Sequence, residues 1–150
     1  MSSYGKQCRD FAELKLSGDV LVATGVNLLT WEIVSDLGDI NYDAGIFTLE
    51  KNHVYELFCV ISTSNFSAAN SFVRFNFVDA DTDLELQEQA ESLYFPHSVT
   101  WWNFGVVTPC RLIHKTTVKQ RVKFRCTLSF GTVTALAINS NLIIRDLGHI

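Results

Sequence analysis

The sequence predicts an all-β fold, an antiparallel sandwich or barrel of about eight to ten short strands. Short apolar runs recur at intervals of roughly ten residues, separated by turns rich in Gly, Asp, Asn and Ser. Hardly any stretch shows the period of an amphipathic helix. The 150 residues suffice to bury roughly two-thirds of the unfolded surface in one domain. We expect residues 1–10 to form an N-terminal arm and residues 11–150 a single domain.

The first part of the chain contains short strand signals separated by turn residues. The alternating and apolar segments, in order, are Phe11–Leu16, Val20–Val22, Val26–Leu29, Trp31–Ile33 and a short strand that begins at Phe47. Because Gly, Asp, Asn and Ser favour turn conformations, these segments should end at turns. The turns are Ser17-Gly18-Asp19, Thr24-Gly25, Ser35 to Asp39, Asp43-Ala44-Gly45 and Lys51-Asn52-His53.

The run from Val54 to Thr63 is the longest apolar strand signal. Side chains alternate between the two faces of a strand. One face carries Tyr55, Leu57, Cys59 and Ile61, and the other carries Val54, Phe58 and Val60. Only Glu56 is charged. A strand that is apolar on both faces is covered on both, so we expect this one in the middle of a layered structure.

The second half of the chain supplies the remaining strands. They are expected at Phe72–Val78, Leu84–Gln87, Val99–Val107, Arg111–His114, Arg121–Phe130, Val133–Ile138 and Leu142–Arg145. The segment Arg121–Phe130 alternates strictly between polar and apolar residues, which indicates one core face and one wet face. Pro109 should restrict the chain between two strands, since proline has no backbone donor. Residues 87–92 could hold a helical turn.

The composition is apolar, aromatic-rich and weakly charged. Hydrophobic residues make up 47% and charged residues 19%, with a formal net charge of −4. An acidic chain with interspersed charges is not expected to bind nucleic acid or an anionic membrane surface. Neither a secretory signal peptide nor an apolar run long enough to span a bilayer is recognisable, so we expect synthesis in a cytosol. The surplus of apolar side chains favours contacts between subunits.

The four cysteines are expected to be thiols rather than disulfides. They are Cys8, Cys59, Cys110 and Cys126. Cys59 and Cys126 lie in the inward rows of predicted strands, where a thiol acts as a small hydrophobic group. The cysteines show neither a C-x-x-C pair nor zinc-site spacing.

A family resemblance starts in the turn before the central strand. Tyr42-Asp43, Gly45-Ile46-Phe47-Thr48 and then Val54-Tyr55-Glu56-Leu57 resemble the signature of the complement globular head within the tumour-necrosis-factor-like superfamily. His53 stands where that family usually has Gly. The resemblance implies an antiparallel jelly roll that closes as a homotrimer. It also implies that Tyr55, Leu57, Trp101 and Trp102 lie at the subunit interface.

Other segments resemble the version of this fold in bacteriophage fibre and head proteins. They are Lys15-Leu16-Ser17, Ala23-Thr24-Gly25 with Trp31-Glu32, and Ser140 to Ile144. We therefore expect a non-enzymatic structural or adhesive module of a virion, either a fibre head or a capsid decoration protein. Residues 1–10 would dock it to another virion protein. The alternative is a soluble cellular TNF-like ligand or a lectin-like carbohydrate-binding module.

An acidic turn is the candidate metal site. Asp79, Asp81 and Asp83 alternate as in a calcium loop, but the standard loop needs Gly at its sixth position and Glu at its twelfth. Leu84 and Ala90 stand there. We interpret the segment as a solvated hairpin turn and expect no metal or cofactor.

Catalytic motifs are not recognisable, and we expect no enzyme. The four histidines are far apart in sequence. Two alternatives stay open: a Cys110 and His114 nucleophile pair, and an enzyme on a sandwich scaffold that uses Asp79, Asp81 or His97.

Aromatic and basic residues supply the last candidates. Trp101 and Trp102 point to opposite faces of a strand. Trp101, Tyr94 and Phe95 could contact a host-surface glycan, although burial in the core or a subunit contact is favoured. A basic cluster consists of Lys115, Lys119, Arg121, Lys123 and Arg125. We interpret it as a solvated strand face, with contact to an acidic partner as the sharper alternative.

Overall fold

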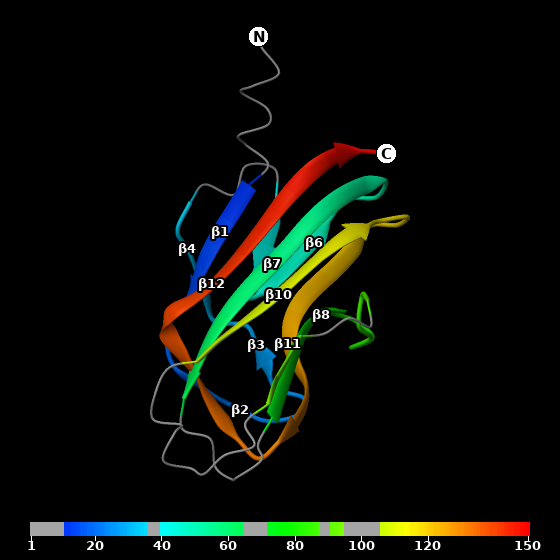
Figure 1. Ribbon diagram of the computed structural model, residues 1–150. Coiled ribbons are helices and arrows are strands. Elements are labelled where there is room, and N and C mark those ends of the chain that lie inside the picture. Colours follow the sequence, from blue (N-terminus) through cyan, green and yellow to red (C-terminus); the bar gives the residue numbers. More distant parts are fainter. Residues whose placement is uncertain (1–10, 36–39, 65–71, 88–90, 95–105) are drawn as a thin grey trace.

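A computed structural model describes residues 11–35, 40–64, 72–87, 91–94 and 106–150, and within these ranges the chain is all-β (Figure 1). The strands are β1 (Phe11–Leu16), β2 (Val20–Val22), β3 (Asn27–Leu28), β4 (Trp31–Ile33), β5 (Asn41–Asp43), β6 (Ile46–Leu49), β7 (His53–Ser64), β8 (Phe72–Asp79), β9 (Glu91–Tyr94), β10 (Val106–Lys115), β11 (Gln120–Phe130) and β12 (Val133–His149). No helix that could cross a membrane occurs in these ranges.

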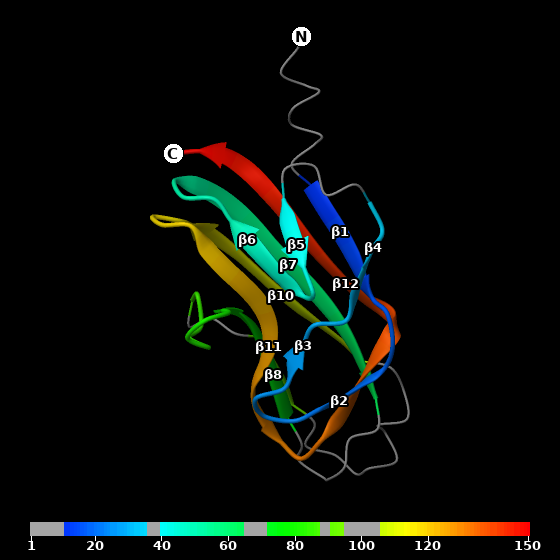
Figure 2. The same cartoon turned by 180° about the vertical axis from the view of Figure 1, so that it is seen from behind.

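Two antiparallel sheets lie face to face, as Figures 1 and 2 show from opposite sides. The first, which we call the β7 sheet, has the order β10-β7-β12-β1-β4, and β2 pairs with β12. The second, the β11 sheet, has the order β5-β6-β11-β8-β9, and β3 pairs with β11. Strands far apart in sequence are neighbours in both sheets. The predicted antiparallel jelly-roll sandwich is confirmed.

The core fills the space between the two sheets. The largest fully buried side chains include Phe47, Phe75, Phe77 and Phe124. The Phe124 ring lies 5.6 Å from the Phe75 ring and 4.9 Å from the Phe77 ring, between ring centroids. Aromatic pairs at such distances add stabilisation beyond the burial of their area. The strict alternation predicted for Arg121–Phe130 is found from Val122 to Cys126, after which a register shift interrupts the pairing of β11 with β8.

The two faces of β7 are also as predicted. Tyr55, Leu57, Cys59 and Ile61 are buried in the core, whereas Val54, Phe58 and Val60 on the opposite face are only partly buried. The strand pairs with β10 on one side and β12 on the other. The central position predicted from the apolar character of both faces is therefore correct.

Several element predictions need correction. The structure describes twelve strands rather than eight to ten, because segments of two to four residues each pair separately. Pro109 does not separate two strands: it lies inside β10, opposite Val60, and β10 is an edge strand, where a missing backbone donor is tolerated. The C-terminal segments form one long strand, β12, with a register shift between Leu136 and Asn141.

The segment after β8 also differs from the prediction. Residues 91–94 form β9, which pairs with β8, rather than a helical turn. The returning segment Leu84–Gln87 makes only one bridge to β8, between Val78 and Glu85. Gln87, at the end of this segment, accepts a hydrogen bond from the Asn76 side-chain amide through its backbone carbonyl, at 2.6 Å. Backbone hydrogen bonds from Asp79 to Leu84, at 2.8 Å, and from Leu86 to Phe77, at 3.1 Å, hold this segment along the edge of β8.

Candidate functional site

The outer face of the β7 sheet, the side turned away from the core, is the first candidate interaction surface. Its rows run across β10, β7, β12 and β1 in register. The residues are Phe11, Glu13, Val54, Glu56, Phe58, Val60, Arg111, Ile113, Asn141, Ile143 and Arg145. Phe58 lies between Arg111 and Ile143 in one such row. The solvent-exposed face of an antiparallel sheet is normally polar. An outer face with Phe58, Val60 and Ile143 at its centre therefore indicates that this side of the sheet is also covered.

Glu56 on this face is paired with two arginine side chains. The Glu56 carboxylate accepts hydrogen bonds from Arg111, at 2.9 Å from Nε, and lies 3.6 Å from the Arg145 guanidinium. The Arg145 guanidinium also lies over the Phe11 ring, 5.2 Å from its centroid. Only 15% of the Glu56 side chain is exposed. These contacts tie both arginine side chains to Glu56, next to the partly buried Phe58 and Ile143 on the same face.

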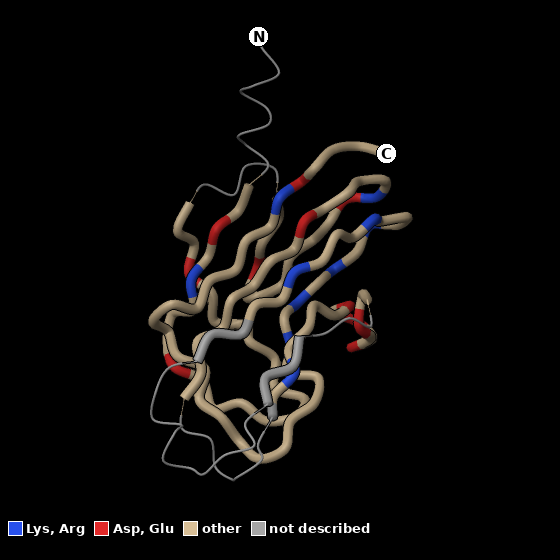
Figure 3. Tube along the Cα trace, in the orientation of Figure 1, with Lys and Arg blue, Asp and Glu red and all other residues tan. Residues whose placement is uncertain are grey.

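The acidic turn and the basic cluster, predicted as separate features, bind each other. Asp81 pairs with Arg121 at 2.6 Å, and Asp83 pairs with Lys123 at 2.5 Å and with Arg125 at 3.1 Å. Acidic and basic segments are accordingly interspersed along the chain (Figure 3). The turn covers Lys123, whose side chain is 10% exposed. The basic face is thus largely neutralised within the chain, which removes the reason to expect an acidic partner.

The carboxylates of the turn do not converge as metal ligands would. Those of Asp81 and Asp83 point to different basic side chains, and the Asp79 carboxylate accepts bonds from its own turn. Within the described ranges, His, Cys, Asp and Glu side chains form no group of three or more that could hold a metal ion. The pKa of Asp83 is lowered, chiefly by the hydrogen bond from Lys123. The segment is a hairpin turn with charged partners.

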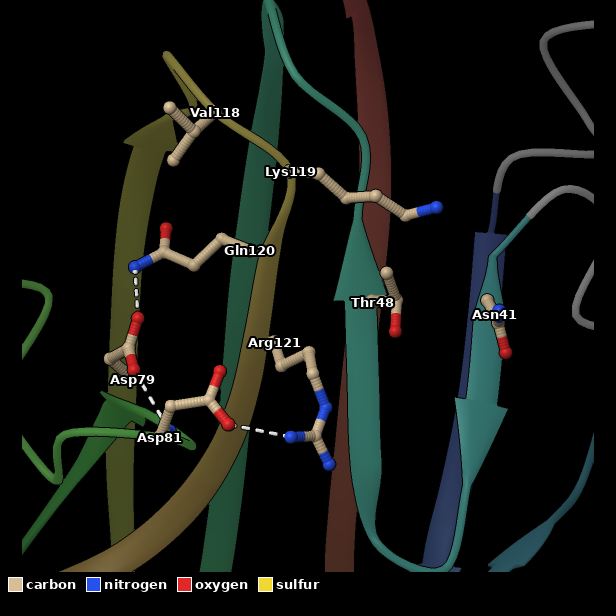
Figure 4. Close-up of a pocket in the computed structure, with 8 residues that line it drawn as sticks. All are labelled: Asn41, Thr48, Asp79, Asp81, Val118, Lys119, Gln120 and Arg121. Carbon is tan, nitrogen blue, oxygen red and sulfur yellow. Dashed lines mark hydrogen bonds and ion pairs between the residues drawn. The ribbon is translucent and has the colours of Figure 1, made fainter.

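A polar groove borders this turn (Figure 4). It has a volume of ≈ 370 Å³ and is lined by Asn41, Thr48, Asp79, Asp81, Val118, Lys119, Gln120 and Arg121. A neighbouring hollow of ≈ 390 Å³ shares Asn41, Thr48 and Arg121 with it. These three residues form one row across β5, β6 and β11. The lining carries two acids and two bases but neither His, Cys nor Ser, so it suits a neutral polar ligand better than a reaction by a base and a nucleophile.

Asp79 anchors one wall of the groove. Its carboxylate accepts hydrogen bonds from the backbone N–H groups of Asp81 and Thr82, at 2.9 and 3.0 Å, and from the Gln120 amide at 3.0 Å. Burial raises the pKa of Asp79, but these hydrogen bonds to the charged form outweigh burial and leave the pKa below its usual value. The turn conformation therefore depends on the ionised carboxylate.

This dependence predicts how stability changes with pH. Because the folded-state pKa of Asp79 is lowered, its contribution is present above the unfolded-state pKa, about 3.9, and is lost as the pH falls through the folded-state value. We expect Asp79→Asn to flatten the decline of Tm between about pH 5 and pH 2 relative to the wild type. Thermal unfolding followed by circular dichroism measures this, and Asp43→Asn, on the exposed end of β5, is the control. Parallel curves for Asp79→Asn and the wild type would contradict the assignment.

Two of the predicted interface residues lie in the core of a single chain. Tyr55 is 3% exposed and accepts a hydrogen bond from the Glu50 backbone N–H at 2.9 Å, and Leu57 is fully buried. Neither has side-chain area left to give to a neighbouring copy, so β7 can contact another chain only through its outward row. The interface role of Tyr55 and Leu57 stays a prediction that this burial does not favour.

Of the other predicted contact residues, one lies in a described strand. Tyr94 lies in β9, opposite Phe72. Phe95, His97, Trp101 and Trp102 lie outside the described residues, as do Cys8 and the arm 1–10. Cys110 and His114 both lie on β10, but they are four residues apart, about 13 Å along a strand, with Leu112 between them. Because the His114 ring instead bonds the Gln120 side chain at 2.7 Å, these two residues do not form a nucleophile pair.

A clasp near the C-terminus was not predicted from the sequence. His53 lies 2.8 Å from the Asp146 carboxylate, and its ring is 5.0 Å from the His149 ring. The Ile150 backbone N–H donates to the Asn52 carbonyl at 2.7 Å. One signal in the sequence could have pointed to this clasp: His53 stands where the resembled signature has Gly. The clasp fixes the end of β12 against β7.

Comparisons with known proteins identify the fold. No protein-family model matches the chain, and no curated protein matches it either. Among solved structures, the chain is similar to Eiger TNF from S. frugiperda, with a TM-score of 0.68, 15% identity and 93% of each chain covered. The globular domain of zebrafish complement 1qA protein has a TM-score of 0.61 at 10% identity, covering 94% of this chain and 99% of that one.

A third similar structure is murine APRIL, with a TM-score of 0.62 at 8% identity, covering 91% of this chain and 98% of that chain. At these identities the likeness concerns the fold alone. The chain therefore has the jelly-roll fold that is also found in Eiger TNF and in the complement 1qA globular domain, across nearly its whole length.

Proposed function

We propose that this protein is a non-enzymatic binding module that works as a homotrimer, with the outer face of the β7 sheet as its assembly surface. The observation that carries the proposal is the apolar centre of that face. Phe58, Val60 and Ile143 are only partly buried in one chain, although they lie in the middle strands of the sheet. Covering them with further copies removes apolar area from water, which is the usual source of subunit affinity.

The surrounding charges suit a contact between copies rather than a contact with a charged partner. Glu56 is flanked by Arg111 and Arg145, and Glu13 lies beside Ile143, so acids and bases alternate on the face. Alternating charges of both signs allow one face to meet another part of an identical chain without strong repulsion. The threefold symmetry is carried over from the resemblance to the TNF-like superfamily.

The biological setting we propose is a virus particle, in which the trimer acts as a fibre head or capsid decoration protein and residues 1–10 dock it. The support is the sequence resemblance of Lys15-Leu16-Ser17 and Ser140 to Ile144 to phage proteins. A soluble TNF-like ligand is the second candidate, because the solved structures of similar fold include a TNF. Under either setting, the polar groove beside Arg121 is the place where we expect a neutral, hydroxyl-rich ligand such as a glycan to bind.

The mass of the purified protein in solution tests the assembly. We expect sedimentation equilibrium to give a single species of three times the 16.9 kDa chain mass at micromolar concentration. A monomer at every concentration would contradict the proposal, and a stable dimer would contradict its symmetry. The setting is tested separately, by mass spectrometry of particles purified from the source culture. The peptide signal should follow the capsid protein through a density gradient, and a signal confined to the soluble fraction would favour the ligand role.

A further inference from the structure

Two cysteines face each other across neighbouring strands in the core. Cys59 on β7 and Cys110 on β10 are directly opposite in the antiparallel register. Both side chains point inward, with exposed fractions of 0% and 1%. Both are thiols in the structure, as is Cys126. Cys126 has no such neighbour in register, because Phe75 lies opposite it on β8.

The spacing of opposite residues in an antiparallel pair is close to that of a disulfide. Such residues have Cα atoms about 4.5–5.5 Å apart and Cβ atoms at about the same separation. A disulfide takes Cα atoms about 4.4–6.8 Å apart and Cβ atoms about 3.5–4.5 Å apart. The backbone therefore already lies within range, and an approach of about 1 Å or less by the two side chains completes the geometry.

The position of β10 at the sheet edge determines how the Cys59 and Cys110 sulfurs become accessible to an oxidant. In the described sheet β10 is an edge strand, with β7 as its one neighbour in the strand order. Separating β10 from β7 exposes both sulfurs at once, whereas no central strand has to leave the sheet. Burial raises the pKa of Cys59, and the neighbouring Cys110 raises it further, so Cys59 stays a thiol in the closed protein. Reaction thus needs the edge strand to open, which occurs locally in folded proteins.

We propose that Cys59 and Cys110 are an intramolecular disulfide site, which forms when the protein meets an oxidising disulfide such as oxidised glutathione. The thiolate of one cysteine attacks a sulfur of the oxidant and releases one molecule of reduced glutathione. The second thiolate then attacks the mixed disulfide and releases another. Two protein thiols lose two electrons and two protons, and one glutathione disulfide becomes two thiols. The product joins β10 to β7 and closes a loop that contains β8 and β9.

The test uses a variant in which only this pair remains, Cys8→Ser with Cys126→Ala. It is incubated with oxidised glutathione in urea below its unfolding midpoint, and the remaining thiols are then alkylated in denaturant. We expect the intact mass to show two thiols lost and no glutathione added, and peptide mapping to show the Cys59 and Cys110 peptides linked. The Tm of the oxidised form should rise by about 10 °C over the reduced form.

A matched control keeps two buried thiols that belong to different sheets. It is Cys8→Ser with Cys110→Ala, which retains Cys59 and Cys126. Burial raises the pKa of Cys126 to about 11, so this control matches the first variant in low reactivity but lacks the opposite register. We expect it to keep both thiols under the same treatment. Equal linkage in the control would overturn the proposed site. The site would also be overturned if the variant with Cys59 and Cys110 kept both thiols, or only took up glutathione, even when it was refolded from urea in the same buffer.

Discussion

Replacing Gly45 with Ala is expected to lower the free energy of unfolding by about 3 kcal/mol or more. Gly45 and Ala44 form the two-residue turn between β5 and β6, and both have positive φ, of 86° and 50°. Such a turn matches the twist of the two strands and normally has Gly or Asn at these positions. A Cβ atom on residue 45 would lie 2.4 Å from the Leu29 Cα atom. Since that contact is with backbone, either the hairpin or the segment before β4 has to move.

Two other glycines separate the causes of this effect. Gly148 has a positive φ of 124° but open space around a Cβ atom, so Gly148→Ala measures the backbone strain without the clash. Gly18 has neither feature, and Gly18→Ala should be neutral or stabilise by up to about 1 kcal/mol. Urea unfolding of all three variants gives the comparison. A Gly45→Ala variant no less stable than Gly148→Ala would show that the contact with Leu29 is absent in solution.

Phe58→Asp is expected to convert the proposed trimer into monomers, with a rise of about 100-fold or more in the concentration at which it dissociates. The change removes an aromatic side chain from the centre of the assembly surface. It also places a second carboxylate beside Glu56, and assembly would strip the water from this new charge. Because Phe58 points away from the core, the fold of the single chain should persist. Analytical ultracentrifugation gives the mass, and far-UV circular dichroism checks the fold.

The control places the same charge on the opposite side of the molecule. Leu128, in β11, is 42% exposed on the outer face of the β11 sheet, so Leu128→Asp should leave the trimer intact. Ile143→Asp, beside Phe58 in the same row, should behave like Phe58→Asp. If Phe58→Asp and Ile143→Asp remained trimeric, or if Leu128→Asp alone dissociated, the assembly surface would be assigned to the wrong sheet.

Local patterns in the sequence were enough to predict most of the strands. The two apolar faces of β7 appear in the structure as predicted, since side-chain direction along a strand follows directly from sequence order. The alternation of Arg121–Phe130 holds only as far as Cys126: beyond the register shift, Leu128 and Phe130, which were predicted on the core face, are 42% and 54% exposed. The predictions failed where pairing partners decide the outcome. Pro109 was expected to interrupt a strand, and it does not, because β10 lies at a sheet edge.

The candidate sites show the same division. Asp79, Asp81 and Asp83 and the basic cluster were recognised from the sequence, but only the fold places the turn against β11, where the charges neutralise each other. Tyr55 and Leu57 were recognised as one face of a strand, but the sequence could not show which face would meet the other sheet. Phe58 and Ile143, which lie on the outward face and which we propose as assembly residues, were therefore not singled out from the sequence.

By itself, the sequence determined that this protein is all-β, a sandwich or barrel of short strands with a long central strand and a turn at Gly45, because strand periodicity and turn conformation depend on residues close together in the chain. Only the tertiary structure decided which residues become neighbours across the sheets: Glu56 with Arg111 and Arg145, Asp83 with Lys123, and Cys59 with Cys110. In a jelly roll most strand partners are distant in sequence. Register, which sets these contacts, is therefore fixed by the packing of the whole sandwich.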